Sequence, residues 1–226
     1  MTTMIVVFDL DDTLYPERQF ALSGFAAAEL WAQTALGVAG LAVDLTRLLD
    51  AGHLGQVFRL ALAERLPDHR PEHVEGLIAA YRSHAPRLTL FEDASWALAH
   101  FAAHTKLGLI TDGTHGLQRR KVEALGVATQ FHDIVYTGAL GRAFAKPHRQ
   151  GYEMIAAALG SGNDRFVYVG DNPAKDFVAP NALGWVSVMV DRPGVSRIHA
   201  GAKTAPGGEP RFTVPSLRQL PAVLAL

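Results

Sequence analysis

Cysteine is absent from all 226 positions of the sequence. Its absence excludes disulfides, thiolate zinc sites, iron–sulfur clusters and cysteine nucleophiles, and it fits a reducing compartment. An excess of charge of either sign is also missing, because 21 basic and 22 acidic residues leave a formal net charge of −1. Since no net positive field would gather polyanions, we expect neither nucleic acid nor an anionic membrane as a partner.

Long hydrophobic runs are missing as well, because no apolar stretch approaches the ~20 residues that a membrane-spanning helix requires. No basic residue precedes the first apolar stretch, so the N-terminal sequence does not have the pattern of a signal peptide. We therefore expect a cytoplasmic protein. The 49% share of hydrophobic residues is sufficient for the core of one domain, or of one domain with a sizeable insertion.

Short apolar runs that stop at Asp, Thr or Gly recur along the chain, and we interpret them as buried strands of a parallel sheet. Patterns of helical length lie between these runs. Single strands that alternate with single helices predict an α/β fold with a doubly wound, mainly parallel sheet of the Rossmann-like type. The expected strands are residues 4–8, 107–110, 133–137, 166–169, 185–190 and 212–214, and the expected helices are residues 94–104, 116–125, 149–159, 174–183 and 216–224.

Residues 16–88 break this alternation, because they contain helical patterns but no convincing strand. Pro86 disfavours helix in the residue before it, so residues 85–87 are interpreted as the return to the sheet. The sequence therefore predicts a core of residues 1–15 and 89–226 with an all-helical insertion at residues 16–88. The helices expected in the insertion are residues 17–36, 43–51, 54–66 and 71–84.

The first expected strand runs directly into an acidic segment, Asp9-Leu10-Asp11-Asp12-Thr13. Ligands of open α/β sheets bind beyond the carboxyl ends of the strands, and three carboxylates at that place repel one another unless a cation offsets them. Carboxylate oxygens suit Mg²⁺, which also keeps waters and substrate phosphate as ligands. An acidic cap of the following helix is the alternative, and it explains a single Asp better than it explains this cluster.

Polar residues also follow the later strands. Thr111-Asp112-Gly113 could hold phosphate oxygens through a hydroxyl and loop amides, although an ordinary turn is the simpler explanation of this triplet alone. Lys146 could supply a point charge for phosphate, whereas a surface lysine is the commoner role of such a residue. Asp171 could complete a metal site and Asp176 could orient its water ligands; the alternative is a turn that starts a helix.

Together these segments resemble the four motifs of the haloacid dehalogenase superfamily, and they occur in that family's order. The motifs are Asp9-x-Asp11-x-Thr13, Thr111-Asp112-Gly113, Lys146-Pro147 and Gly170-Asp171-x-x-x-x-Asp176. The helical insertion resembles the family's cap domain, and residues 170–184, which contain Asn181-Ala182-Leu183-Gly184, resemble a phosphatase-type branch. The resemblance covers nearly the whole chain and implies a Rossmann-like catalytic core with an inserted helical cap.

The resemblance also implies roles for individual residues. Asp9 is similar to the nucleophile that takes up a phosphoryl group, and Asp11 to the general acid and base. The residues implied to bind the phosphoryl group are Thr111, Asp112, Gly113 and Lys146. The Mg²⁺ ligands implied are Asp9, the backbone carbonyl of Asp11 and Asp171, with Asp176 as a supporting or direct ligand.

The activity implied is that of a Mg²⁺-dependent phosphatase, which would hydrolyse a small phosphate monoester, a sugar phosphate or nucleotide, through an aspartyl-phosphate. A dehalogenase of the same fold is an alternative, but halide release needs neither a proton nor Mg²⁺, so Asp11 and Asp171 favour phosphate. A phosphomutase and a non-catalytic binding module are further alternatives. The expected partner is a small phosphorylated metabolite, and the expected assembly is a monomer or homodimer.

The acid role requires Asp11 to have a pKa above its usual value of about 3.9, and neighbouring carboxylates would raise it while a metal ion would lower it. Other polar groups are interpreted as structural. The histidine pairs have no third ligand at a useful spacing, and the basic run 118–121 is interpreted mainly as a solvated helix face. Residues assigned to the surface or packing of the insertion, rather than to substrate contact, are Arg18, His53, Arg82 and His84.

Overall fold

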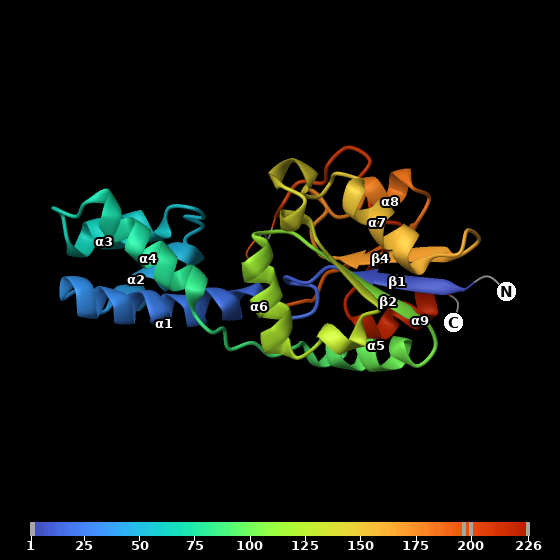
Figure 1. Ribbon diagram of the computed structural model, residues 1–226, viewed down its shortest axis with the longest axis horizontal. Helices are drawn as coiled ribbons and strands as arrows, with labels where there is room; N and C mark the ends of the chain where they lie inside the picture. Colours follow the sequence, from blue (N-terminus) through green and yellow to red (C-terminus); the bar gives the residue numbers. More distant parts are fainter. Residues whose placement is uncertain (1–2, 196–197, 199–200, 225–226) are drawn as a thin grey trace. The chain divides into compact units, whose positions relative to one another are not determined.

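The computed structural model describes residues 3–195, 198 and 201–224 of the chain. The chain divides into two compact units, one made of residues 1–17 with 88–226 and the other of residues 18–87. The first unit carries the sheet and the second is helical (Figure 1). None of the helices among the described residues combines the length and the apolar composition that a bilayer crossing requires.

The described residues of the first unit form a six-stranded parallel sheet with the strand order β3-β2-β1-β4-β5-β6. β1 lies at its centre, and residues Ile5, Val6, Val7 and Phe8 are completely buried. This burial explains the continuous apolar runs, because both faces of a parallel strand are covered by helices. The strands are β1 (Met4–Phe8), β2 (Lys106–Thr111), β3 (Asp133–Tyr136), β4 (Arg165–Gly170), β5 (Val186–Val190) and β6 (Phe212–Val214).

Helices cover both faces of the sheet, with α5 and α9 on one side and α7 and α8 on the other (Figure 1). The strand order reverses direction at β1, since the chain proceeds from β1 through β2 to β3 and then crosses to β4. Such a reversal is the place where open α/β sheets bind ligands. The doubly wound α/β prediction is confirmed. The helices of this unit are α5 (Glu92–Ala102), α6 (His115–Leu125), α7 (Gln150–Leu159), α8 (Val178–Ala182) and α9 (Leu220–Leu224).

α8 is much shorter than the helix predicted for residues 174–183. The reason is the turn that precedes it, in which the Ala174 amide donates to Asn172 Oδ1 at 3.0 Å and the Asp176 carboxylate accepts from the Asn172 amide at 2.9 Å. These side-chain contacts replace helical hydrogen bonds with a turn, as Asn and Asp commonly do. Residues 171–176 therefore form a turn rather than the start of a helix, and this turn places their side chains at the carboxyl edge of the sheet.

The helical unit consists of α1 (Glu17–Leu36), whose first residue belongs to the sheet unit, followed by α2 (Leu41–Asp50), α3 (Val57–Arg65) and α4 (Pro71–Ser83). Its core includes a ring cluster in which Phe58 lies 5.9 Å from Phe25 and 5.2 Å from Tyr81, measured between centroids. α4 approaches α1 closely at Gly76, where an added Cβ would lie 2.1 Å from the Trp31 ring. The Trp31 ring of α1 thus packs directly against Gly76 of α4.

Two of the four polar residues singled out in the insertion make structural contacts inside the helical unit. Arg18 forms a two-pronged pair with Asp50, and His84 Nε2 lies 2.8 Å from Ser23 Oγ. The histidine pairs also have ordinary partners, since His73 helps to cap α4 and His100 stacks on Trp96.

Candidate active site

The loops that follow β1, β2 and β4 meet at the carboxyl edge of the sheet, because these three strands are neighbours and parallel. Asp9 follows β1 directly, and its amide donates to the Val169 carbonyl of β4 at 2.8 Å. This backbone bond fixes the position of Asp9 beside the loop that carries Asp171 and Asp176. Residues more than 160 positions apart in the chain are brought together in this way.

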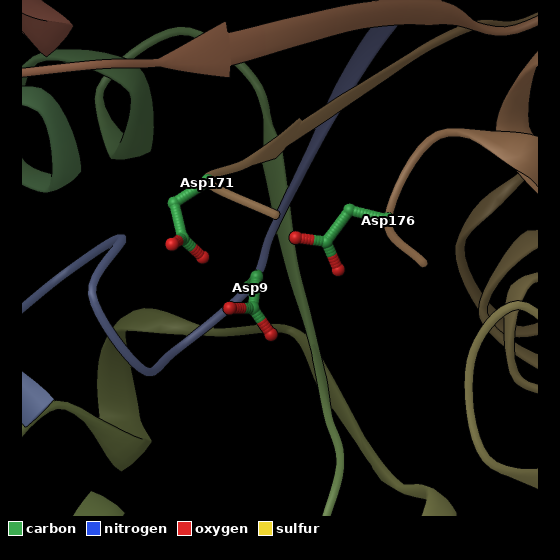
Figure 2. Close-up of side chains that lie close together, drawn as sticks. All are labelled: Asp9, Asp171 and Asp176. Carbon is green, nitrogen blue, oxygen red and sulfur yellow. The ribbon is translucent and has the colours of Figure 1, made fainter. Parts of the chain in front are cut away.

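Three buried carboxylates converge at this edge. Oxygen atoms of Asp9, Asp171 and Asp176 all lie within 4.8 Å of one another. Figure 2 shows the three side chains turned toward a common space. Gly170 permits this approach, because an added Cβ would lie 2.6 Å from Asp176 Oδ2. Among the described residues, the Asp11 side chain does not belong to this cluster. Its carboxylate contacts Gln118 and Lys121 instead.

Lys146 lies against the carboxylate cluster with its side chain completely buried. Its ammonium donates to Asp9, to Asp176 Oδ1 at 2.9 Å and to the hydroxyl of Tyr168 at 2.9 Å. Burial disfavours the ammonium, but the charges of Asp176 and Asp9 outweigh it and raise the pKa of Lys146 well above its usual value. Lys146 is therefore a permanent cation that orients two of the three carboxylates.

One ammonium does not balance the charge of three carboxylates. The raised pKa values of Asp9 and Asp171 reflect this surplus of negative charge. Burial and the neighbouring charge of Asp176 raise the pKa of Asp9 to about 6, although Lys146 opposes the shift. Burial, together with Asp176 and Asp9, raises the pKa of Asp171 well above its usual value. A group of buried oxygens with excess negative charge matches the ligands and the charge that Mg²⁺ prefers. The residues present therefore fit a divalent cation held by Asp9, Asp171 and Asp176.

Asp11 belongs to a second group of polar side chains, in which its carboxylate is only partly buried. Its carboxylate accepts from Lys121 Nζ at 2.7 Å, from Gln118 Nε2 at 2.7 Å and from the Tyr15 hydroxyl. Burial opposes ionisation of Asp11, but the Lys121 ammonium and the hydrogen bonds from Lys121, Tyr15 and Gln118 outweigh it, and its pKa is lowered. The upward shift that the acid role requires is therefore not found in this arrangement.

The interpretation of residues 118–121 as a mainly solvated face is wrong for two of the four. Gln118 and Lys121 are 1% and 2% exposed, whereas Arg119 lies on the exposed side of α6 and pairs with Glu123. The spacing of Gln118 and Lys121 could have indicated their shared burial, because residues three apart on a helix share a face. Glu17 lies 3.8 Å from Lys121, and burial together with the Asp11 charge raises the pKa of Glu17 to about 8.

The segment after β2 surrounds the same space. Thr111 is buried, and its Oγ1 accepts from Gln118 Nε2 at 2.5 Å, while Gly113 is exposed at the loop tip. Asp112 Oδ1 accepts from the Thr137 hydroxyl at 2.7 Å and from the Lys146 amide at 3.0 Å. Burial opposes the ionisation of Asp112, but nearby lysines outweigh it and lower its pKa. Asp112 thus links the loop after β2 to the segments that contain Thr137 and Lys146.

Lys175 is a site residue that sequence reasoning passed over. Its Nζ lies 3.4 Å from Asp112 Oδ2, and its side chain is 31% exposed. Burial and Lys146 lower its pKa, but the charges of Asp176, Asp9 and Asp112 outweigh them and raise it. The position of Lys175 between Asp171 and Asp176, inside the fourth motif, could have identified it as a site residue.

The loop after β1 is held from outside by Arg192. The guanidinium donates to the carbonyls of Asp12 at 3.3 Å and Thr13 at 3.0 Å, and it pairs with Asp93. Thr13 Oγ1 in turn contacts Asp9 Oδ2 at 3.4 Å. Asp12 has φ +54°, a left-handed conformation that is strained for a non-glycine residue. These hydrogen bonds hold the strained loop in place.

Comparisons with known proteins agree with this architecture. A family model described as haloacid dehalogenase-like hydrolase matches residues 3–184. Glyceraldehyde 3-phosphate phosphatase of Methanopyrus kandleri is 30% identical over 83% of both chains. Phosphoserine phosphatase of Thermus thermophilus is 33% identical over 61% of this chain and 54% of its own. The chain therefore belongs to the haloacid dehalogenase-like hydrolase family.

Solved structures of the family share the fold. The phosphatase of this family from Thermococcus onnurineus aligns with a TM-score of 0.61 at 18% identity, over 99% of this chain and 98% of its own. L-2-haloacid dehalogenase from Xanthobacter autotrophicus aligns with a TM-score of 0.64 at 20% identity, over 100% and 99%. Both likenesses concern the fold, and the fold alone does not select between phosphate and halide chemistry.

Proposed function

We propose that the chain is a Mg²⁺-dependent phosphatase that hydrolyses a small phosphate monoester through an aspartyl-phosphate on Asp9. The observation that carries this proposal is the convergence of three buried carboxylates and one buried lysine at the carboxyl edge of the sheet. Asp9, Asp171 and Asp176 are the residues that would hold the ion, with the backbone carbonyl of Asp11. Bound Mg²⁺ would offset the negative charge that repels a phosphoryl group from these carboxylates.

The residues of the site have complementary tasks in this reaction. Asp9 attacks the phosphorus in line with the ester oxygen, and Lys146 holds its carboxylate in position. The Thr111 hydroxyl and the exposed amides near Gly113 are the groups that would bind phosphoryl oxygens. These contacts stabilise the charge that the reacting group carries as it transfers to Asp9.

Asp11 handles the protons. It donates one to the departing alcohol and later removes one from the water that hydrolyses the aspartyl-phosphate. The lowered pKa of Asp11 suits the second task directly, because a general base must be ionised. The first task requires a protonated Asp11, so proton donation to a poor leaving group is the more demanding of the two steps.

The alternatives account for less of the site. A halide leaves without a proton and without a metal ion, so a dehalogenase would have no use for the oriented Asp11 or for Asp171. A phosphomutase would require the intermediate to be shielded from water. A non-catalytic module would not need the nucleophile and the lysine in contact. The relatives named as phosphatases act on glyceraldehyde 3-phosphate and phosphoserine, which supports a small phosphorylated metabolite as the substrate.

The helical unit, predicted at residues 16–88, serves as the cap that selects the organic part of the substrate. The site residues described above handle only the phosphoryl group, which all phosphate monoesters share. The helical unit contains its own pocket of about 420 Å³, lined by Ser23, His84 and Arg87 together with apolar residues of α1. A cytoplasmic location and a monomeric or homodimeric state stay predictions from the sequence.

The decisive experiment is a screen of phosphate esters with Mg²⁺, with excess chelator and after Mg²⁺ is restored. We expect hydrolysis that is lost on chelation and recovered with the ion. Asp171→Asn should raise the Mg²⁺ concentration needed for half-maximal activity at least about 10-fold, because one carboxylate ligand is lost. Full activity in excess chelator would exclude the metal role, and release of halide from haloacids without phosphatase activity would favour the alternative chemistry.

A further inference from the structure

The two lysines of the site differ in how many of their donors are engaged. An ammonium has three N–H groups. Those of Lys146 have three acceptors, Asp9, Asp176 and the Tyr168 hydroxyl, and its side chain is completely buried. A phosphoryl oxygen could bind Lys146 only if one of these acceptors were released. In this structure all three donors of Lys146 thus hold protein groups.

Lys175 is in the opposite situation. Its one carboxylate contact is long, 3.4 Å to Asp112 Oδ2, and its side chain is 31% exposed. An ion pair of this length and exposure contributes little stability, so its loss costs little. The ammonium can therefore leave Asp112 for a stronger anion without disturbing the fold.

The location of Lys175 decides which part of the substrate it can reach. Its contact with Asp112 spans the gap between the loop after β2 and the loop after β4. Thr111 ends β2 and the first loop begins after it with Asp112 and Gly113, whereas the second loop supplies Asp171 and Asp176. A phosphoryl group seated beside Asp9 would lie between the same two loops. Four carboxylates in this region face only two lysines, so a dianionic substrate needs every available positive charge.

We propose that Lys175 is a substrate-binding residue whose ammonium binds a phosphoryl oxygen. The proposal rests on the proposed phosphatase function and adds Lys175 to the phosphoryl-binding residues that the family resemblance implies, Lys146 among them. Lys146 orients the carboxylates of Asp9 and Asp176, and Lys175 moves from Asp112 to the incoming phosphate. A hydrogen bond to a charged group at this position should change phosphate affinity about 10- to 100-fold.

The test compares Lys175→Gln, Lys175→Arg and the wild type in the presence of Mg²⁺. The dissociation constant of inorganic phosphate is measured by isothermal titration calorimetry, and KM and kcat are measured with p-nitrophenyl phosphate. We expect Lys175→Gln to weaken phosphate binding and raise KM at least about 10-fold, and Lys175→Arg to stay within about threefold of the wild type. Lys203→Gln, which removes an exposed lysine outside the site, is the matched control and should change neither value.

The outcomes separate the proposal from the proposed function. If the wild type binds phosphate, Lys175→Gln weakens that binding and no ester is hydrolysed, the phosphatase function fails and the role of Lys175 stands. If Lys175→Gln hydrolyses esters with unchanged KM and phosphate affinity, Lys175 is a counter-ion of Asp112 and the proposal is overturned. Absence of phosphate binding in the wild type also overturns it. Lys175→Met, which keeps the aliphatic stem, replaces the Gln variant if that variant does not fold.

Discussion

Two groups of side chains near the loop after β1 each contain one buried lysine and two carboxylates, which are buried in the first group and partly exposed in the second. Lys146 meets Asp9 and Asp176, and Lys121 meets Asp11 at 2.7 Å and Glu17 at 3.8 Å. Both lysine side chains are almost inaccessible, at 0% and 3% exposure. The two groups nevertheless differ in net charge.

The Lys146 group carries a surplus of negative charge, because Asp171 adds a third carboxylate and its pKa is raised well above its usual value. In the Lys121 group, the neutral donors Gln118 and Tyr15 also bind the Asp11 carboxylate and satisfy its hydrogen bonding. The first group is therefore suited to receive a cation and an anionic substrate. The second fixes the direction of the Asp11 carboxylate and favours its ionised form.

The largest difference between the groups should appear when their carboxylates are exchanged for amides. Asp9→Asn removes the nucleophile, so the rate of hydrolysis should fall about 10⁴-fold or more with every phosphate ester. No phosphoenzyme should form. Quench-flow trapping with a radiolabelled substrate checks this, and labelled protein with the Asn variant would place the nucleophile elsewhere.

Asp11→Asn should have an effect that depends on the leaving group. With an alkyl phosphate the missing acid should cost about 10²–10⁴-fold in rate. With p-nitrophenyl phosphate the nitrophenolate leaves without a proton, so Asp9 should still be phosphorylated and the intermediate should then hydrolyse slowly. Stopped-flow absorbance should show a burst near one equivalent followed by slow turnover. Equal suppression of both substrates without a burst would contradict the proton-transfer role.

Lys121→Met should reproduce a weaker form of the Asp11 effect, because the carboxylate remains but loses its cationic partner. We expect a loss of about 10-fold or more in kcat with the alkyl phosphate, a smaller loss with p-nitrophenyl phosphate and an unchanged requirement for Mg²⁺. Arg119→Met, which alters the exposed side of the same helix, is the control and should leave both rates unchanged. A changed Mg²⁺ requirement in the Lys121 variant would show that the two groups are not independent.

The smallest effect should come from the Arg192–Asp93 pair, which supports the loop that the two groups share. Burial opposes ionisation of Asp93, but Arg192 and the Leu217 amide outweigh it and lower its pKa. Because the folded pKa lies below the unfolded value, the stabilisation is complete above about pH 4 and is lost as the pH falls through the folded pKa. Urea unfolding between pH 5 and pH 2 should therefore be less steeply pH-dependent in Asp93→Asn than in the wild type.

The control for this measurement is Glu209→Gln, which neutralises an exposed carboxylate without an ion-pair partner among the described residues. Its unfolding free energy should keep the pH dependence of the wild type. An Asp93→Asn variant with the full wild-type dependence would show that the pair does not couple proton binding to folding.

The sequence was most informative where one physical requirement acts alone. Complete burial of both strand faces produces continuous apolar runs, so β1 was predicted with its observed ends. The rule that ligands gather at the carboxyl ends of parallel strands, together with the family motifs, selected Asp9, Lys146, Asp171 and Asp176, and the structure places these four side chains together.

The residues that escaped prediction act through side chains that a linear pattern does not distinguish. Lys121 stands in a basic run with two arginines, and only the helical phase shows that it faces Asp11. Tyr168 lies in an apolar strand, where its hydroxyl contact with Lys146 has no sequence signal. Arg192 meets a loop about 180 positions earlier in the chain, and no local rule relates the two. The direction of the Asp11 pKa shift depended on Lys121, Tyr15 and Gln118, whose contacts with Asp11 have no signal in the linear sequence.

The central place of β1 also sets an order of events during synthesis. β1 precedes its two neighbours in the chain, yet it is paired by β2 on one side and β4 on the other. About 100 residues must follow β1 before β2 exists, which takes roughly 5–20 s at translation rates of about 5–20 residues per second. Asp9 is thus made early, but Lys146, Asp171, Asp176 and Arg192 reach it last. A nascent chain accordingly carries the proposed nucleophile before the residues that surround it, and the candidate active site is complete only when nearly the whole sheet has formed around the first strand.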